Sequence, residues 1–164
     1  MRRVIIAISI ILALSGGIGA YFLTRTSSIE AVESTQQPIT VIDLFNEVNA
    51  QRRLTNLPEL MLDPKLNLSA CDKLSTITDP SKVTHDNFKS FINDRTPDSP
   101  HVGENMAQSN ENVSEVVRSW MDSKGHRENI LMPDYERVGY CVGTLNFTYL
   151  GRENLTAIVQ HFAN

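Results

Sequence analysis

The chain lacks a surplus of basic residues and has almost no cysteine. Lysine and arginine total 15 against 19 aspartates and glutamates, so the formal net charge is -4. Without a stripe of positive charge to neutralise phosphates, a nucleic-acid partner is excluded. No internal repeat is present, which argues against an array of stacked units. The length of 164 residues and the apolar content of 41% predict one domain with enough apolar side chains for a core.

The N-terminus has the features of an export signal. Arg2 and Arg3 precede an apolar run from Val4 to Leu23, and this run is about long enough to cross a bilayer. Small residues near its end also suit cleavage as a signal peptide, namely Gly17, Gly19 and Ala20. We expect a signal-anchor or a signal peptide over residues 1–23. We favour the uncleaved anchor, which places the domain outside the cytoplasmic membrane, and release is the alternative.

The polarity of the chain changes after the apolar run. Residues 24–38 are rich in Ser, Thr and Gln, which predicts a flexible linker. From residue 39 the pattern becomes helical, so we assign residues 39–164 to the folded domain. Thr40 and Asp43 have the spacing of a capping box, and this predicts a first helix that ends near Leu54.

Periodicity predicts further elements downstream. Asp63 or Pro64 is expected to begin a second helix that runs to about Thr78, with a buried stripe of Leu66, Leu68, Cys71, Leu74 and Ile77. A weaker helix is predicted over residues 86–92. Alternating apolar residues predict strands over 137–144 and 155–162, joined by a turn at 151–154.

The helix that begins at Asn112 has the strongest signals. Asn112 and Glu115 form a second capping box, and one face then collects Val113, Val116, Val117, Trp120 and Met121. Trp120 is therefore expected in the core. Gly125 is predicted to be the left-handed residue after this helix, so that His126 is presented on a loop.

The two cysteines raise the question of a disulfide. On the oxidising side of a membrane Cys71 and Cys141 are free to pair, which would tie the second helix to a strand. The alternative is two separate buried thiols. We favour the disulfide. Neither cysteine is predicted to be catalytic, because the sequence supplies no dedicated base beside it.

Five segments occur in an order that resembles one protein family. They are residues 44–53, residues 57–60 with 66–70, the motif Gly103-Glu104-Asn105 with W-x-x-S-x-G-H-R over 120–127, residues 139–143 and residues 159–162. Together they resemble the bacterial branch of the CAP superfamily, the cysteine-rich secretory, antigen 5 and pathogenesis-related 1 proteins, also called SCP domains. The resemblance implies an α+β fold, a three-layer α/β/α sandwich, here preceded by an N-terminal hydrophobic helix.

The resemblance also implies a central cleft with two histidines and two carboxylates. The matching positions are His85, Glu104 and His126, while Ser123 stands where other members have the second carboxylate. Serine is a poor metal ligand, so His85, Glu104 and His126 are left as the three strong ligands for a divalent cation such as Zn²⁺. His101 is a rival for the first histidine, although its position is not a ligand position of the family.

Two candidate residues have structural alternatives. Glu104 could hold its loop by accepting backbone N–H bonds, and Asn105 fits that role as well. His161 is expected to be a structural residue of the last strand.

These observations predict an extracytoplasmic binding or interaction module. Its cleft, lined by His85, Glu104, Ser123 and His126, would receive a cell-envelope, lipid or protein ligand. The alternative is a metal-dependent hydrolase that acts on a cell-envelope or peptide substrate through zinc-bound water. The missing second carboxylate favours binding, because no general base remains once Glu104 is a metal ligand.

Overall fold

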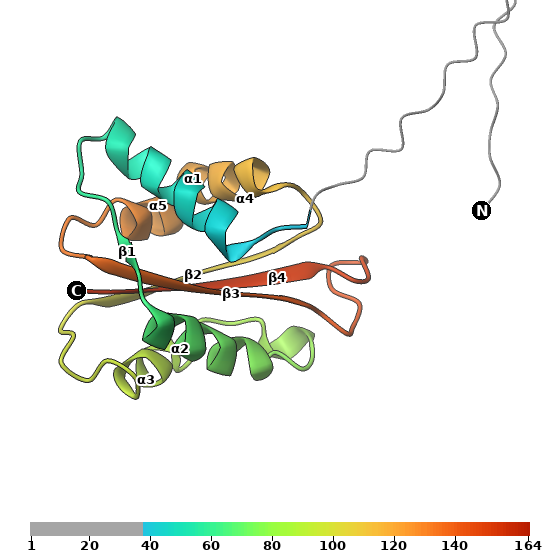
Figure 1. The fold of residues 1–164 in the computed structure, drawn as a ribbon. Coiled ribbons are helices and arrows are strands. Elements are labelled where there is room, and N and C mark those ends of the chain that lie inside the picture. The colour runs from blue at the N-terminus through green and yellow to red at the C-terminus, as the bar shows by residue number, and fades with distance from the viewer. Residues whose placement is uncertain (1–37) are drawn as a thin grey trace, which may run out of the picture. The chain divides into compact units, whose positions relative to one another are not determined.

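A computed structural model describes residues 38–164 of the chain (Figure 1). Within that range no helix has both the length and the apolar character needed to cross a membrane. The predicted anchor over 1–23 and nearly all of the predicted linker over 24–38 lie outside the described residues. Both assignments therefore stay predictions.

A four-stranded sheet forms the middle layer of the domain, in the order β1-β3-β4-β2. Its strands are β1 (Met61–Leu62), β2 (Val102–Ser109), β3 (Arg137–Thr144) and β4 (Thr156–Ala163). β4 pairs antiparallel with both β2 and β3, while β1 runs parallel to β3. β3 and β4 confirm the two predicted strands, with β4 displaced by one residue. β2, which carries the Gly103-Glu104-Asn105 motif at an edge of the sheet, was not predicted, and Glu104 lies in a strand rather than a loop.

Helices cover both faces of the sheet (Figure 1). One face is covered by α1 (Val41–Leu54), α4 (Val113–Asp122) and α5 (Lys124–Ile130), and the other by α2 (Pro64–Ser75) and α3 (Phe88–Asn93). A single 3₁₀ turn, η1 (Pro80–Lys82), follows α2. The arrangement confirms the three-layer α/β/α sandwich and the α+β class.

Side-chain caps fix where the main helices begin. The Thr40 side chain accepts from the Asp43 N–H, and the Asn112 side chain accepts from the Glu115 N–H. Asp63 caps α2 in the same way. Each bond satisfies an N–H that has no partner inside its helix, so these helix starts are encoded locally.

Trp120 lies in the core, as its position on α4 predicted. Its side chain is 1% exposed, and Nε1 donates to the carbonyl oxygen of Met106 on β2 at 3.1 Å. Val116 and Val117 belong to the same cluster, which includes Leu44 of α1. The apolar face of α4 is thus buried between the sheet and α1.

The buried face of α2 differs from the predicted stripe. Leu68 is 53% exposed and Cys71 is also exposed, whereas the buried residues are Leu66, Ser69, Ala70 and Lys73. Their spacing of three and four residues is that of one helix face. Leu66 and Ile77 are buried as predicted, but Leu68 and Cys71 are not. The prediction missed this face because it excluded polar side chains, whereas Ser69 and Lys73 are buried with hydrogen-bond partners.

The turn after α4 also differs from the prediction. Ser123 has an extended backbone, with φ -85° and ψ 123°, and it is the residue at which α4 ends and α5 begins. Gly125 is the second residue of α5, and His126 is the third. The break is therefore made by Ser123, and His126 lies in the first turn of a short helix rather than on a loop.

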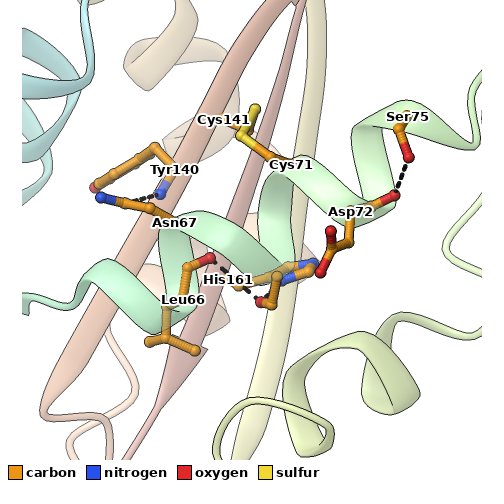
Figure 2. Close-up of a disulfide and its surroundings, with 9 residues drawn as sticks. Leu66, Asn67, Cys71, Asp72, Ser75, Tyr140, Cys141 and His161 are labelled. Atoms are coloured by element: carbon orange, nitrogen blue, oxygen red, sulfur yellow. Dashed lines mark hydrogen bonds between the residues drawn. A yellow bond between two sulfur atoms is a disulfide. The ribbon is translucent and has the colours of Figure 1, made fainter.

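The predicted disulfide between Cys71 and Cys141 is present and joins α2 to β3 (Figure 2). Close by, the Asn67 side chain accepts from the backbone N–H of Tyr140 at 2.8 Å. Gly139 makes this close approach possible, because a Cβ there would lie 2.2 Å from the backbone carbon of Leu66. The disulfide and the hydrogen bond hold α2 against β3, and the absence of a side chain at Gly139 lets the two elements pack closely.

Candidate functional site

Glu104 is the centre of the candidate site. It lies directly opposite His161 in the pairing of β2 with β4, so the two side chains meet on the same face of the sheet. The Oε2 atom of Glu104 is 3.0 Å from Nε2 of His161, and both side chains are fully buried. His161, predicted to be structural, is in direct contact with a predicted site residue.

His85 approaches the same carboxylate from the loop after η1. Its Nδ1 atom lies 2.8 Å from Oε1 of Glu104, while its own side chain is 53% exposed. Both oxygens of Glu104 therefore accept from imidazole rings. The His85 ring connects the buried carboxylate to solvent.

His126 completes the group of side chains that the structure brings together. Its ring centroid is 6.2 Å from that of His85, with the ring planes tilted by 56°. The structure thus gathers His85, Glu104 and His126, three of the four predicted cleft residues.

Ser123 and His101 are placed differently. Ser123 separates α4 from α5, and its hydroxyl makes no capping bond to α5. Within residues 38–164 no hydrogen bond joins Ser123 to the histidines or to Glu104. His101 precedes β2, is exposed, and bonds through its backbone N–H to the side chain of Asn164. His85, and not its rival, contacts Glu104.

Charges around the site keep Glu104 ionised. Burial alone would raise the pKa of Glu104, but hydrogen bonds from His161 and His85, together with electrostatic attraction from His161 and then Lys73, outweigh it and hold the pKa below its usual value. Burial, with a smaller contribution from His85, lowers the pKa of His126. At neutral pH the site therefore combines a buried carboxylate with an uncharged His126.

Lys73 is a residue of this site that the sequence analysis missed. It is 2% exposed, and its Nζ donates to the carbonyl oxygen of Asp86 at 2.7 Å. Because Asp86 follows His85 directly, this bond fixes the loop that presents the imidazole. The signal for Lys73 was its position on the buried face of α2, four residues after Ser69.

Asn105 connects β2 to the helix that carries His126. Its Nδ2 donates to the carbonyl oxygen of His126 at 3.2 Å and to the side chain of Gln160 at 3.0 Å. Asn129 of α5 donates to Oδ1 of Asn105 at 2.9 Å. Asn105 therefore has a positioning role, although it holds a helix by donating rather than a loop by accepting.

Gly103 completes the explanation of the motif. A Cβ at this position would lie 2.4 Å from the hydroxyl oxygen of Tyr135, so a side chain there would displace the ring. In Gly103-Glu104-Asn105, the glycine allows close packing, the glutamate anchors the histidines and the asparagine places α5.

A hollow of about 310 Å³ opens beside His126, between the second half of β2 and α4. Its wall is mainly polar and includes Gln108, Glu111, Glu115, Ser119 and Arg152. Arg152 comes from the turn between β3 and β4. The hollow extends the surface around His126 along β2.

The candidate metal ligands are His85, Glu104 and His126. Within residues 38–164 no three His, Cys, Asp or Glu side chains are arranged to hold a metal ion. Glu104 would have to release one of its two imidazole partners to become a ligand. The residues present therefore do not fit a three-ligand zinc site in this arrangement, and the predicted metal set of His85, Glu104 and His126 stays a prediction.

Comparison with known proteins gives matches over most of the chain. The family model for the cysteine-rich secretory protein family, CAP, matches residues 45–162. The uncharacterized protein YkwD of Bacillus subtilis is 32% identical over an alignment of 126 residues, which covers 71% of this chain and 45% of that protein. The chain thus spans less than half the length of this relative.

Three solved structures share the fold. An outer surface protein of Borrelia burgdorferi has a TM-score of 0.61 at 23% identity, covering 74% of this chain and 89% of its own. An extracellular SCP-domain protein of Bacillus anthracis also has a TM-score of 0.61, at 22% identity and with coverage of 76% and 40%. A cysteine-rich secretory protein of Staphylococcus aureus has a TM-score of 0.59 at 22% identity, with coverage of 84% and 44%. At these identities the likeness is one of fold.

Proposed function

Because the chain belongs to the cysteine-rich secretory protein family, CAP, we propose that it is an extracytoplasmic binding module whose cleft at His85 and His126 receives a cell-envelope ligand. One observation carries the proposal: both oxygens of Glu104 are occupied by His85 and His161. A fully buried carboxylate held in this way orients two imidazole rings and is not exposed to a water that it could activate. Binding is therefore favoured over hydrolysis.

The exposed groups of the cleft define the chemistry of the ligand. Half of the His85 side chain is accessible, and the neighbouring His126 is uncharged at neutral pH because burial lowers its pKa. The adjoining hollow supplies amide, hydroxyl and carboxylate groups from Gln108, Ser119 and Glu111. Such a surface suits a ligand rich in hydroxyl and amide groups, and the glycopeptide of a cell wall has that chemistry.

An extracytoplasmic location is part of the same proposal. Relatives of the fold are described as an outer surface protein and as an extracellular protein. Arg2 and Arg3 before an apolar run support export of this chain, and the disulfide between Cys71 and Cys141 suits an oxidising compartment. We propose that the domain is held outside the cytoplasmic membrane by residues 1–23.

Divalent-cation binding has one observation in its favour. Nδ1 of His85 bonds to a carboxylate, and metal-binding imidazoles commonly have such a partner on the other ring nitrogen. We propose that a cation such as Zn²⁺ contacts His85 and His126, without Glu104 as a ligand, and supports ligand binding. A metal-dependent hydrolase is the second candidate, but it needs a base that Glu104 does not supply.

Co-sedimentation of the full-length chain in detergent with isolated cell-wall sacculi tests the proposal. His85→Ala and His126→Ala should each weaken binding by roughly tenfold or more, as the loss of a positioned contact does. His101→Ala is the matched control, because His101 is exposed and makes no contact with the cleft. Equal binding by all three variants would refute a role for the cleft. Parallel runs with anionic lipid vesicles distinguish a wall ligand from a lipid ligand. Runs with and without added Zn²⁺ show whether the cation supports binding.

A further inference from the structure

Four side chains form an unbroken line of hydrogen bonds from the interior of the domain to the cleft. Ser69 Oγ lies 2.6 Å from Nδ1 of His161, whose Nε2 lies 3.0 Å from Glu104, and the other oxygen of Glu104 lies 2.8 Å from Nδ1 of His85. Ser69 and His161 are 0% exposed. Figure 2 shows His161 against α2, the helix that carries Ser69.

The positions of the protons follow from the carboxylate. An ionised carboxylate only accepts, so His161 Nε2 and His85 Nδ1 must each carry a hydrogen. In a neutral imidazole the other nitrogen is then an acceptor. With both rings uncharged, His161 Nδ1 therefore accepts from the Ser69 hydroxyl, and the Nε2 atom of His85 is left as an acceptor on the exposed side of the ring.

The distances around Ser69 agree with a hydrogen bond that runs from its hydroxyl to His161. A hydroxyl has a single hydrogen to donate, and Ser69 has two acceptors within reach, the ring of His161 at 2.6 Å and the carbonyl oxygen of Leu66 at 3.2 Å. The shorter contact marks the bond that the hydroxyl makes.

The order serine, histidine, glutamate is also that of a hydrolase triad, and burial excludes that role here. Ser69 is fully buried on the face of α2 that packs against the sheet, and the hollow beside His126 is lined by other residues. No substrate can reach its hydroxyl. The line of side chains therefore acts through His85, its exposed end.

We propose that Ser69 and His161 are positioning residues that hold Glu104 so that His85 keeps its hydrogen on Nδ1 and presents Nε2 to the ligand as an acceptor. This inference rests on the proposed function of the cleft and defines its ligand more closely. The group that meets His85 is a hydrogen-bond donor or a cation, and an anionic group is rejected.

The imidazole ¹⁵N spectrum of the full-length chain in detergent tests the proposal directly, because the sequence has 4 histidines. At about pH 8, above the ordinary pKa of histidine, the rings are compared in the wild type, Ser69→Ala and His161→Gln. Ser75→Ala is the matched control, since Ser75 also lies on α2 but donates to the carbonyl oxygen of Asp72.

In the wild type, His85 should show a protonated Nδ1 and an unprotonated Nε2, and His161 the reverse. Ser69→Ala and His161→Gln should move the two His85 resonances toward each other, because the ring then exchanges between tautomers. Ser75→Ala should leave them in place. The opposite His85 tautomer in the wild type, or an unchanged His85 in either folded variant of Ser69 or His161, would overturn the proposal. Because no wall ligand is present in these samples, the result is independent of sacculus binding.

Discussion

Arg52 of α1 donates through NH1 to the carbonyl oxygen of Ile130, the last residue of α5, at 2.9 Å. The guanidinium is fully buried and also reaches the carbonyl oxygens of Pro58, Met132 and Tyr135. One side chain thus donates to a carbonyl oxygen at the C-terminal end of the helix that carries His126, where the carbonyls have no partner inside the helix. The first helix is in this way connected to the helix that carries His126.

Arg52→Met should lower the free energy of unfolding by about 3 kcal/mol or more, because several buried carbonyls lose their donor at once. Arg53→Met is the control at the next position. Arg53 is exposed and pairs with Glu59, so its loss should cost less than about 1 kcal/mol. Urea unfolding measures both. Similar small losses would mean that water replaces Arg52 and that the clamp is unimportant.

Two glycines should respond to alanine in opposite directions. Gly139→Ala places a Cβ 2.2 Å from the backbone of α2 and should destabilise the domain by about 2 kcal/mol or more. Gly125 is helical and has open space around its Cβ position, so Gly125→Ala should stabilise by about 0.5 to 1 kcal/mol. Thermal unfolding of the pair tests this. A destabilised Gly125→Ala would show that residue 125 is not helical and would support the left-handed conformation that the sequence predicted for it.

Removing the disulfide should reduce stability substantially. Cys71 and Cys141 are 70 residues apart, and a closed loop of this size is worth about 4 kcal/mol in the chain-entropy model. Chemical unfolding of the Cys71→Ala, Cys141→Ala double variant, compared with the oxidised protein, measures the difference. Thiol labelling of unfolded, unreduced protein recovered from the membrane fraction provides the check, and labelling of both cysteines would show that the bond does not form.

Stability should fall in acid partly through Glu104. Its folded pKa is lower than its unfolded value of about 4.3, so the unfolded state binds more protons as the pH falls through that window. The stability that the carboxylate contributes is present above about pH 4.3 and is lost toward the folded pKa. Glu104→Gln should therefore be less stable than the wild type at neutral pH and lose less on acidification. Parallel stability curves from pH 7 to pH 3 would show that Glu104 does not titrate with folding.

Local patterns were sufficient for much of the fold. Thr40 and Asn112 mark helix starts that side-chain caps create, and the apolar face of α4 identified Trp120 as a core residue. β3 was predicted over its full range because its apolar and small residues alternate. These signals depend only on neighbours in the sequence.

The site itself was harder to predict, because its geometry depends on contacts between distant residues. β2 escaped detection since Glu104 and Asn105 interrupt its apolar pattern, and both are buried only because they have partners on other elements. The contact between Glu104 and His161 arises from the register of β2 with β4, which no local pattern reveals. Ser69 and Lys73 were overlooked because their burial also depends on hydrogen-bond partners far away in the sequence.

The most direct measurement of the central claim uses the four histidines as reporters. Soluble glycopeptide fragments of the cell wall are titrated into ¹⁵N-histidine-labelled full-length chain in detergent. If the cleft binds this chemistry, the resonances of His85 and His126 shift with saturation, while those of exposed His101 stay in place. Shifts confined to His101, or none at any fragment concentration, would contradict the account.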